Sequence, residues 1–222
     1  MLKPEKLFPP RDYRLMVVLL LVGALLTCVS LFFVDLPVAR WCYEHQEWPK
    51  PWKELRKLVM LLEIFGHFWG AALLLVALPI LDPAMRPRWK RVLGIFLAIG
   101  LAPNIVKLSL ARFRPRYFFT EDYQGLRDSF TDTFGAWFPL LESKSILQSF
   151  PSGHSTLAFG MAVVLTWLYP RGRWLFVTLA IAVLVQRVVS CAHFPSDTIV
   201  GAVLGTLLAT LLLPAEKKSS LP

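Results

Sequence analysis

Three short stretches of the chain combine residue types that can hold and transfer a phosphate group. They are Lys107 to Pro115, Pro151 to His154, and Arg187 to Asp197. Their lysine and arginine side chains can bind phosphoryl oxygens, and a histidine can attack phosphorus or transfer a proton. Taken together, the stretches predict a phosphate site that contains a nucleophile and an acid.

The Pro-Ser-Gly-His stretch directly precedes an apolar run that begins at Leu157. Proline is favoured in the first turn of a helix, and the unsatisfied amides of that turn attract anions. Gly153 lets a ligand approach the backbone closely, Ser152 adds a hydroxyl, and His154 adds an imidazole. For this stretch alone, the alternative is an ordinary helix cap with a histidine at the membrane interface.

The third stretch brings a histidine close to a carboxylate. Pro195 is expected to open the last helix, so Asp197 falls in its first turn and can reach back to His193. Such a contact fixes the tautomer of the imidazole and raises its basicity. Gly201 and Gly205 follow Asp197 at intervals of four, so this helix face is predicted to pack closely. The alternative is a capping aspartate beside an unrelated histidine.

The first stretch places two cations seven residues apart. Lys107 and Arg114 share a helix face if the helix that contains Lys107 continues that far. Pro115 argues that the helix ends there. The alternative is a basic cap whose side chains snorkel to the membrane edge.

Long apolar runs must position these stretches. The chain has 222 residues, of which 55% are hydrophobic, and short charged loops separate the runs. A membrane helix needs roughly 20 apolar residues. The pattern predicts one all-α membrane domain over residues 1–222, with six helices at about 15–34, 58–81, 92–107, 155–169, 174–189 and 198–213. The first run is expected to be a retained span, because it is too long for a signal peptide.

The net charge of +9 lies mainly in loops beside these runs, and the short loop 82–91 is strongly basic. Basic loops favour the cytoplasmic side, so both termini are expected to be cytoplasmic in a plasma or inner membrane. This asymmetry explains the charge without a nucleic-acid partner. Lys53, Arg56 and Lys57 go against it, because the topology places them outside.

This topology brings the three stretches together. The third and fifth helices end on the outer side, and the fourth and sixth begin there. The site is therefore expected at the outer ends of helices three to six, in the loops 108–153 and 190–197, facing the periplasm or exterior.

The same residues resemble the type 2 phosphatidic acid phosphatase (PAP2) family, also known as lipid phosphate phosphatases. The family signature is Lys-x6-Arg-Pro, then Pro-Ser-Gly-His, then Ser-Arg-x5-His-x3-Asp. Its order and spacing match this chain over about half its length. Gln186 stands where the family usually has serine, and we interpret it as tuning because glutamine can still form hydrogen bonds.

The resemblance implies a metal-independent lipid phosphatase without cofactors. His193 would attack phosphorus to form a phosphohistidine, Asp197 would orient it, and His154 would act as acid and then as base. The implied phosphate-binding residues are Lys107, Arg114, Ser152, Gly153 and Arg187. The substrate would be a lipid phosphate from the bilayer, such as polyprenyl diphosphate, phosphatidic acid, phosphatidylglycerol phosphate or a lipid A type glycolipid.

Two other functions use the same residues. A phosphotransferase would pass the phosphate from polyprenyl diphosphate to an acceptor lipid instead of water. A non-catalytic relative would only bind phospholipids, but such a protein is expected to lose a catalytic histidine or the aspartate, and this chain keeps all three.

Several further features carry separate predictions. Glu63 and His67 lie one helical turn apart, and we favour a mutual hydrogen bond over a functional role. Free thiols are favoured over a disulfide between Cys42 and Cys191. The loop 116–150 is expected to select the lipid head group. The apolar residues Leu140, Leu141, Ile146 and Leu147 suggest an interfacial helix within it.

Overall fold

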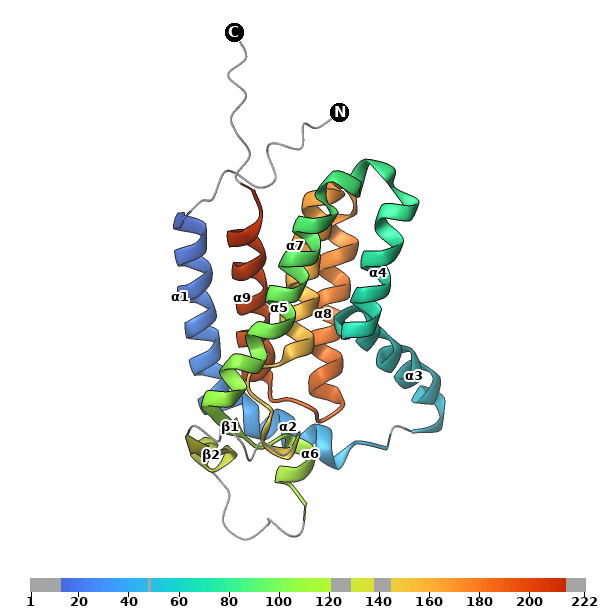
Figure 1. The fold of residues 1–222 in the computed structure, drawn as a ribbon. Coiled ribbons are helices and arrows are strands. Elements are labelled where there is room, and N and C mark those ends of the chain that lie inside the picture. The colour runs from blue at the N-terminus through green and yellow to red at the C-terminus, as the bar shows by residue number, and fades with distance from the viewer. Residues whose placement is uncertain (1–12, 48, 121–128, 138–144, 215–222) are drawn as a thin grey trace.

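Apolar helices that run between two ends of the molecule form most of this computed structural model (Figure 1), which describes residues 13–47, 49–120, 129–137 and 145–214. A helix satisfies its own backbone hydrogen bonds, as a hydrocarbon environment requires. The main helices are α1 (Tyr13–Val29), α4 (Phe68–Leu81), α5 (Trp89–Ser109), α7 (Gly153–Leu168), α8 (Arg173–Val189) and α9 (Pro195–Leu212).

The helices have the lengths of membrane spans. Within the described residues, four helical stretches are long and apolar enough to cross a bilayer: Tyr13–Glu44, Pro83–Ser109, Pro170–Val189 and Pro195–Leu212. The pair Lys53–Gly66 and Phe68–Leu81 is bent by 62° and makes a fifth span if it is taken as one, and α7 is a shorter apolar helix. The expectation of a multi-pass membrane protein is confirmed.

The second predicted span is not one continuous helix. It comprises α3 (Lys53–Leu61), the 3₁₀ segment η4 (Leu62–Gly66) and α4, and it breaks at His67. His67 has an extended backbone, and its Nδ1 accepts a hydrogen bond from the amide of Trp69, 3.3 Å away. The side chain therefore caps α4, and no hydropathy pattern reports such a cap.

The first predicted span continues beyond residue 34. A π-helical turn, η2 (Ser30–Val34), joins α1 to α2 (Asp35–Glu44). Helix α2 lies at the lower end of the bundle in Figure 1, near α6 (Pro115–Phe118) and the strands β1 (Leu110–Arg112) and β2 (Phe134–Trp137). The remaining elements are short 3₁₀ turns: η3 (Lys50–Trp52), η5 (Pro83–Arg88), η7 (Phe130–Thr133), η8 (Ser145–Leu147) and η9 (Pro170–Gly172).

Helices α7 and α9 pack with their backbones close together, as the glycine spacing predicted. A Cβ atom on Gly201 would lie 2.5 Å from the main-chain oxygen of Ser152, and one on Gly205 would collide with that of Thr156. Only glycine allows such an approach. The packing fixes the start of α7 against the first turns of α9.

The segment after α5 differs from the expectation. The helix ends at Ser109, and β1 then pairs antiparallel with β2, so Arg114 does not share a helix face with Lys107. Arg114 is extended because it precedes a proline, which disfavours the helical conformation. Of the suggested interfacial helix, residues 145–147 form only a 3₁₀ turn, and Leu140 and Leu141 lie outside the described residues.

All three cysteines lie in described residues and are free thiols, as predicted. Cys191 has a positive φ of 52° where the chain turns out of α8. Burial, and to a lesser degree Cys42, raises the pKa of Cys191 to about 11, so this thiol stays protonated at neutral pH.

Candidate active site

The three predicted stretches meet at one end of the bundle. Helices α5 and α8 end there and α7 and α9 begin there, at the same end as α2 and the strands (Figure 1). Lys107 lies in the last turn of α5, and Arg187 lies in the last turn of α8. Asp197 lies in the first turn of α9, which Pro195 opens as expected.

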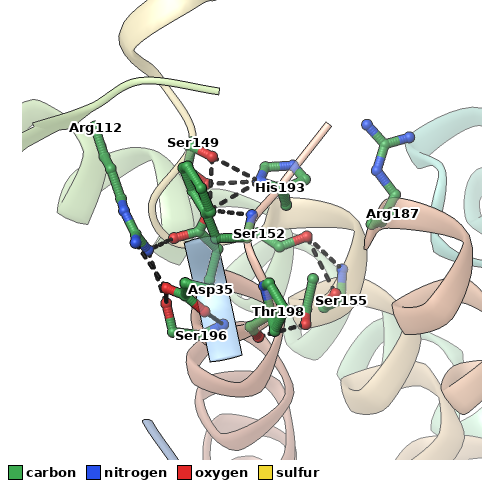
Figure 2. Close-up of polar contacts among 12 residues, drawn as sticks. Asp35, Arg112, Ser149, Ser152, Ser155, Arg187, His193, Ser196 and Thr198 are labelled. Carbon is green, nitrogen blue, oxygen red and sulfur yellow. Dashed lines mark hydrogen bonds and ion pairs between the residues drawn. The ribbon is translucent and has the colours of Figure 1, made fainter. Parts of the chain in front are cut away.

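A buried ion cluster, formed by Asp35, Arg112 and Asp197, lies beneath this end. The side chains of all three are 0% exposed. Arg112 Nη2 donates to Asp35 Oδ2 over 2.7 Å, while Nη1 donates to Asp197 Oδ1. Its guanidinium carbon lies 4.3 Å from the centre of the Phe194 ring. Figure 2 shows how Arg112, Asp35 and Ser196 converge.

Hydrogen bonds saturate this buried ion cluster. Arg112 Nε donates to Thr133 Oγ1 and Nη1 to Ser196 Oγ. Asp35 Oδ1 accepts from Ser30 Oγ over 2.7 Å and from the amide of Ser196 over 2.9 Å. One cation and two carboxylates leave a formal charge of −1. A buried charge of this kind is tolerable only when paired and bonded as fully as here.

Asp197 lies close to His193, as expected, but the hydrogen bond of the imidazole goes to another group. His193 Nδ1 lies 3.8 Å from Asp197 Oδ2 but 2.7 Å from the main-chain oxygen of Ser149. Asp197 Oδ2 instead accepts from Ser149 Oγ over 2.6 Å and from the amide of Phe194 over 2.9 Å. The aspartate therefore caps α9, but the histidine beside it is not unrelated, because Asp197 also holds the Ser149 segment that orients the imidazole.

The contact with Ser149 sets the tautomer of His193. A carbonyl oxygen only accepts hydrogen bonds, so Nδ1 carries the proton and Nε2 keeps its lone pair. The pKa of His193 is lowered to about 3. Burial is the main cause, the charges of Arg187 and Arg114 act in the same direction, and Asp197 acts in the opposite direction. The imidazole is therefore neutral at physiological pH, as a nucleophile must be.

A second group, the open ion cluster, is formed by Glu63, His154 and Arg187. Glu63 Oε1 lies 2.7 Å from Arg187 Nη1 and 3.0 Å from His154 Nε2. The side chain of Glu63 is 33% exposed and that of His154 is 26% exposed. The favoured hydrogen bond between Glu63 and His67 is not the contact found, because Glu63 faces the site. His67 instead lies with its ring centre 5.5 Å from that of His154.

Several cations around the open ion cluster have unused donors. Among the described residues, the buried Nε atoms of Arg114, Arg116 and Arg187 have no hydrogen-bond partner. Burial lowers the pKa of Arg114, and the charges of Arg116 and Arg187 lower it further, so these cations lie close together. Lys107 Nζ would lie 3.9 Å from a Cβ atom on Gly153. Unpaired donors on gathered cations are suited to an anion.

The start of α7 provides further groups. Ser152 is the N-cap of α7, and its Oγ accepts hydrogen bonds from the amide and the hydroxyl of Ser155. This contact fits the ordinary cap that was the alternative for this stretch. Pro151 precedes the cap instead of lying in the first turn. A Cβ on Gly153 would make only ordinary contacts, so the glycine leaves open space beside Lys107.

Sequence reasoning missed Asp35, Arg112, Ser149 and the contacts of Glu63. Asp35 and Glu63 are acidic residues within or next to apolar runs, which is by itself a sign of function or of burial. Arg112 lies between the two motif cations, but nothing in its local sequence distinguishes it from them. Ser149 contributes its main-chain oxygen, which no residue type reveals.

A cavity of about 730 Å³ lies beside α3, lined by Glu47, Lys53, Arg56, Lys57, Met60 and Leu61. Three of these lining residues, Lys53, Arg56 and Lys57, are the cations that the expected topology places outside, against the charge asymmetry. Met60 Sδ lies 3.3 Å from Nε2 of Gln186. Because Gln186 directly precedes Arg187 in the sequence, the cavity adjoins the open ion cluster. Among the described residues, no three His, Cys, Asp or Glu side chains gather to hold a metal.

Known proteins resemble this chain in fold and in sequence. A structure described as the first transmembrane PAP2 type phosphatidylglycerolphosphate phosphatase, from Bacillus subtilis, matches 89% of this chain and 93% of that chain. Its TM-score is 0.54 at 21% identity, which shows a shared fold.

Two curated relatives match part of the sequence. A lipid A 1-phosphatase from Rhizobium johnstonii is 35% identical over 112 residues, which are 50% of this chain and 41% of that protein. An undecaprenyl-diphosphatase from Sulfolobus acidocaldarius is 30% identical over 132 residues, or 57% of this chain and 56% of that protein. The chain thus spans about half the length of these relatives. A family model described as PAP2 superfamily matches residues 88–220, more than half of the chain. The chain therefore belongs to the PAP2 superfamily.

Proposed function

We propose that this protein is a membrane phosphatase that hydrolyses a lipid phosphomonoester or diphosphate through a phosphohistidine. The observation that carries the proposal is the position of His193. Its Nδ1 is bound to the oxygen of Ser149, which leaves the Nε2 lone pair available, and the charges of Arg187 and Arg114 act on the ring. Membership of the PAP2 superfamily and the phosphatase names of the relatives support this chemistry.

In the first step, His193 Nε2 forms a bond to phosphorus while the bond from phosphorus to the lipid oxygen breaks. The departing oxygen takes a proton from His154 Nε2. His154 acts as the acid in its doubly protonated, cationic form and becomes neutral when it gives up this proton. Its Nε2 lies 3.0 Å from the Glu63 carboxylate, whose negative charge stabilises that cationic form. Lys107, Arg114 and Arg187 hold the phosphoryl oxygens with Ser152 and Gly153, and they offset the charge that develops.

In the second step, water attacks phosphorus and His154 accepts one of its protons. The bond between nitrogen and phosphorus breaks, which returns His193 to its neutral form and releases phosphate. The ring of phosphorylated His193 is cationic, and the buried ion cluster next to it has a formal charge of −1. The protein therefore stabilises the intermediate with a charge that is already in place.

The substrate reaches the site from the bilayer with its phosphate at the membrane surface. Both termini are cytoplasmic, the site faces the periplasm or exterior of a plasma or inner membrane, and residues 1–222 act as one domain. Candidate lipids are polyprenyl diphosphate, phosphatidic acid, phosphatidylglycerol phosphate and lipid A type glycolipids. The basic cavity beside α3 adjoins Gln186 and holds part of the head group.

The test is phosphate release by the purified protein from a panel of these lipids, with and without an acceptor lipid. Release of inorganic phosphate without an acceptor, blocked by vanadate and insensitive to chelators, is expected. Trapping of acid-labile, base-stable phosphate on wild type but not on His193→Ala would identify the intermediate. Transfer only in the presence of an acceptor would identify a phosphotransferase and overturn the hydrolase.

A further inference from the structure

Glu63 is the one group of the open ion cluster that the proposed reaction does not use. It comes from η4, at the break between α3 and α4, far in sequence from its partners. Its Oε1 lies 2.7 Å from Arg187 Nη1 and 3.0 Å from His154 Nε2. A carboxylate thus bridges a proposed phosphate ligand and the proposed acid.

The carboxylate lies where an oxygen of the substrate is needed. Arg187 must bind a phosphoryl oxygen, and His154 must reach the leaving oxygen, in each case at the N···O distances that Glu63 Oε1 now has from these donors. The two donors cannot hold Glu63 and a phosphate in these positions together. In addition, two anions at this distance repel each other.

Gln186 keeps Glu63 in this position. Its Nε2 donates to Glu63 Oε2 over 3.1 Å and is buried with Arg187. Gln186 is also the position where the family signature usually has serine. A serine side chain has two heavy atoms and a glutamine side chain has five, so serine lacks the reach of this amide. The departure from the signature thus coincides with a partner for the carboxylate.

The surroundings of Glu63 allow it to leave. Its side chain is 33% exposed, whereas that of Arg187 is only 6% exposed. The short 3₁₀ segment η4 holds it at a bend of 62° between two helices. Figure 2 shows Arg187 directed away from the buried cluster that holds Arg112, so its guanidinium has no carboxylate from that cluster.

We infer that Glu63 is an internal competitor for the phosphate: its carboxylate occupies an oxyanion position of the site and is displaced when a tetrahedral oxyanion binds. The inference rests on the proposed function, because it takes Arg187 and His154 as groups that contact the phosphate. Glu63 acts as a specificity-determining residue, since only an anion that gains more from the cations than the carboxylate does can enter. Weakly bound anions at the membrane surface are thereby kept out.

The test is the binding of orthovanadate and inorganic phosphate to purified wild type, Glu63→Gln and Gln186→Ser, measured by calorimetry. Glu63→Gln is expected to bind both anions about three- to tenfold more tightly, because the competing charge is gone. Gln186→Ser is expected to shift binding in the same direction by about twofold, because it frees the carboxylate without removing it. Glu54→Gln removes the same charge from an exposed pair with Lys57 on α3 and should leave binding unchanged.

The outcomes separate this inference from the proposed function. Unchanged or weaker anion binding in Glu63→Gln would overturn the inference, as would a loss of kcat with unaltered vanadate binding, which marks a partner of His154. If Glu63→Gln does not fold, Gln186→Ser decides in the same way. Calorimetry does not require turnover. A wild type that binds vanadate but cleaves no lipid phosphate would end the proposed function alone.

Discussion

Two ion clusters lie at the same end of the bundle, and they differ in how completely their side chains are buried and hydrogen-bonded. The buried ion cluster of Asp35, Arg112 and Asp197 has no exposed side chain, and each guanidinium nitrogen of Arg112 has an acceptor. In the open ion cluster, Glu63 and His154 are partly exposed, and Arg187 has a buried Nε without a partner. A saturated cluster has nothing left to offer a ligand, whereas an unsaturated one does.

The two clusters contain similar charged groups but hold different parts of the site. The buried ion cluster fixes Asp197 and, through Ser149, the imidazole of His193. The open ion cluster holds its donors available at the surface of the site. His193 lies between the two, with Nδ1 held on the buried side. Variants of the two clusters should therefore fail in different ways.

Removal of the group between the clusters has the largest expected effect. His193→Ala should lose all measurable turnover, because no other described group is placed to take over the bond to phosphorus. Phosphate release and the thermal midpoint of the purified variant are the measurements. A folded His193→Ala with near wild-type turnover would refute the nucleophile.

A change in the open ion cluster should lower activity and spare stability. His154→Ala is expected to reduce kcat by about 10²–10⁴-fold, the usual contribution of a general acid and base. Its side chain is 26% exposed, so the midpoint of thermal unfolding should move little. If His154→Ala lowered the thermal midpoint substantially as well as kcat, the two clusters would not differ in the way described.

A change in the buried ion cluster should lower stability first. Arg112→Leu is expected to lower the free energy of unfolding by about 3–5 kcal/mol, because two buried carboxylates lose their counter-charge. Lys57→Leu is the matched control: it removes a cation from an exposed pair with Glu54 and should cost less than about 1 kcal/mol. Equal thermal midpoints for the two variants would contradict the comparison.

Stability is also expected to depend on pH. The pKa of His193 is lowered to about 3 in the folded protein, whereas the unfolded chain takes up this proton near its ordinary pKa of about 6.5. The contribution is therefore fully present above pH ~6.5 and is lost as the pH falls toward 3, by up to about 1.4 kcal/mol per pH unit. Thermal midpoints of His193→Gln should fall less steeply than those of wild type over this range. Parallel curves would show that His193 is not kept neutral by burial.

Local patterns predicted the parts of the fold that local physics determines. The apolar runs indicated the helices, Pro195 marked the start of α9, and the spacing of Gly201 and Gly205 predicted the close packing against α7. The alternation of inward and outward runs placed the three stretches at one end.

Contacts between distant segments could not be predicted in this way. Asp35 and Ser196 are hydrogen-bonded although they lie 161 residues apart in the sequence, and Gln186 and Glu63 are hydrogen-bonded across a separation of 123 residues. No periodicity or spacing reports such pairs. The break at His67 and the strand after α5 depend on a side-chain cap and a partner strand, which are equally invisible to a window of neighbouring residues.

The family match begins at Arg88, yet Asp35 and Glu63 both precede it. A fragment that starts at residue 88 would carry every residue of the family signature and still lack both of these acids. In such a fragment, Arg112 Nη2 would lose Asp35, its hydrogen-bond acceptor, and Arg187 would lose Glu63, its ion-pair partner. The amino-terminal helices thus supply one carboxylate to each ion cluster, in addition to any part they have in holding the chain in the membrane.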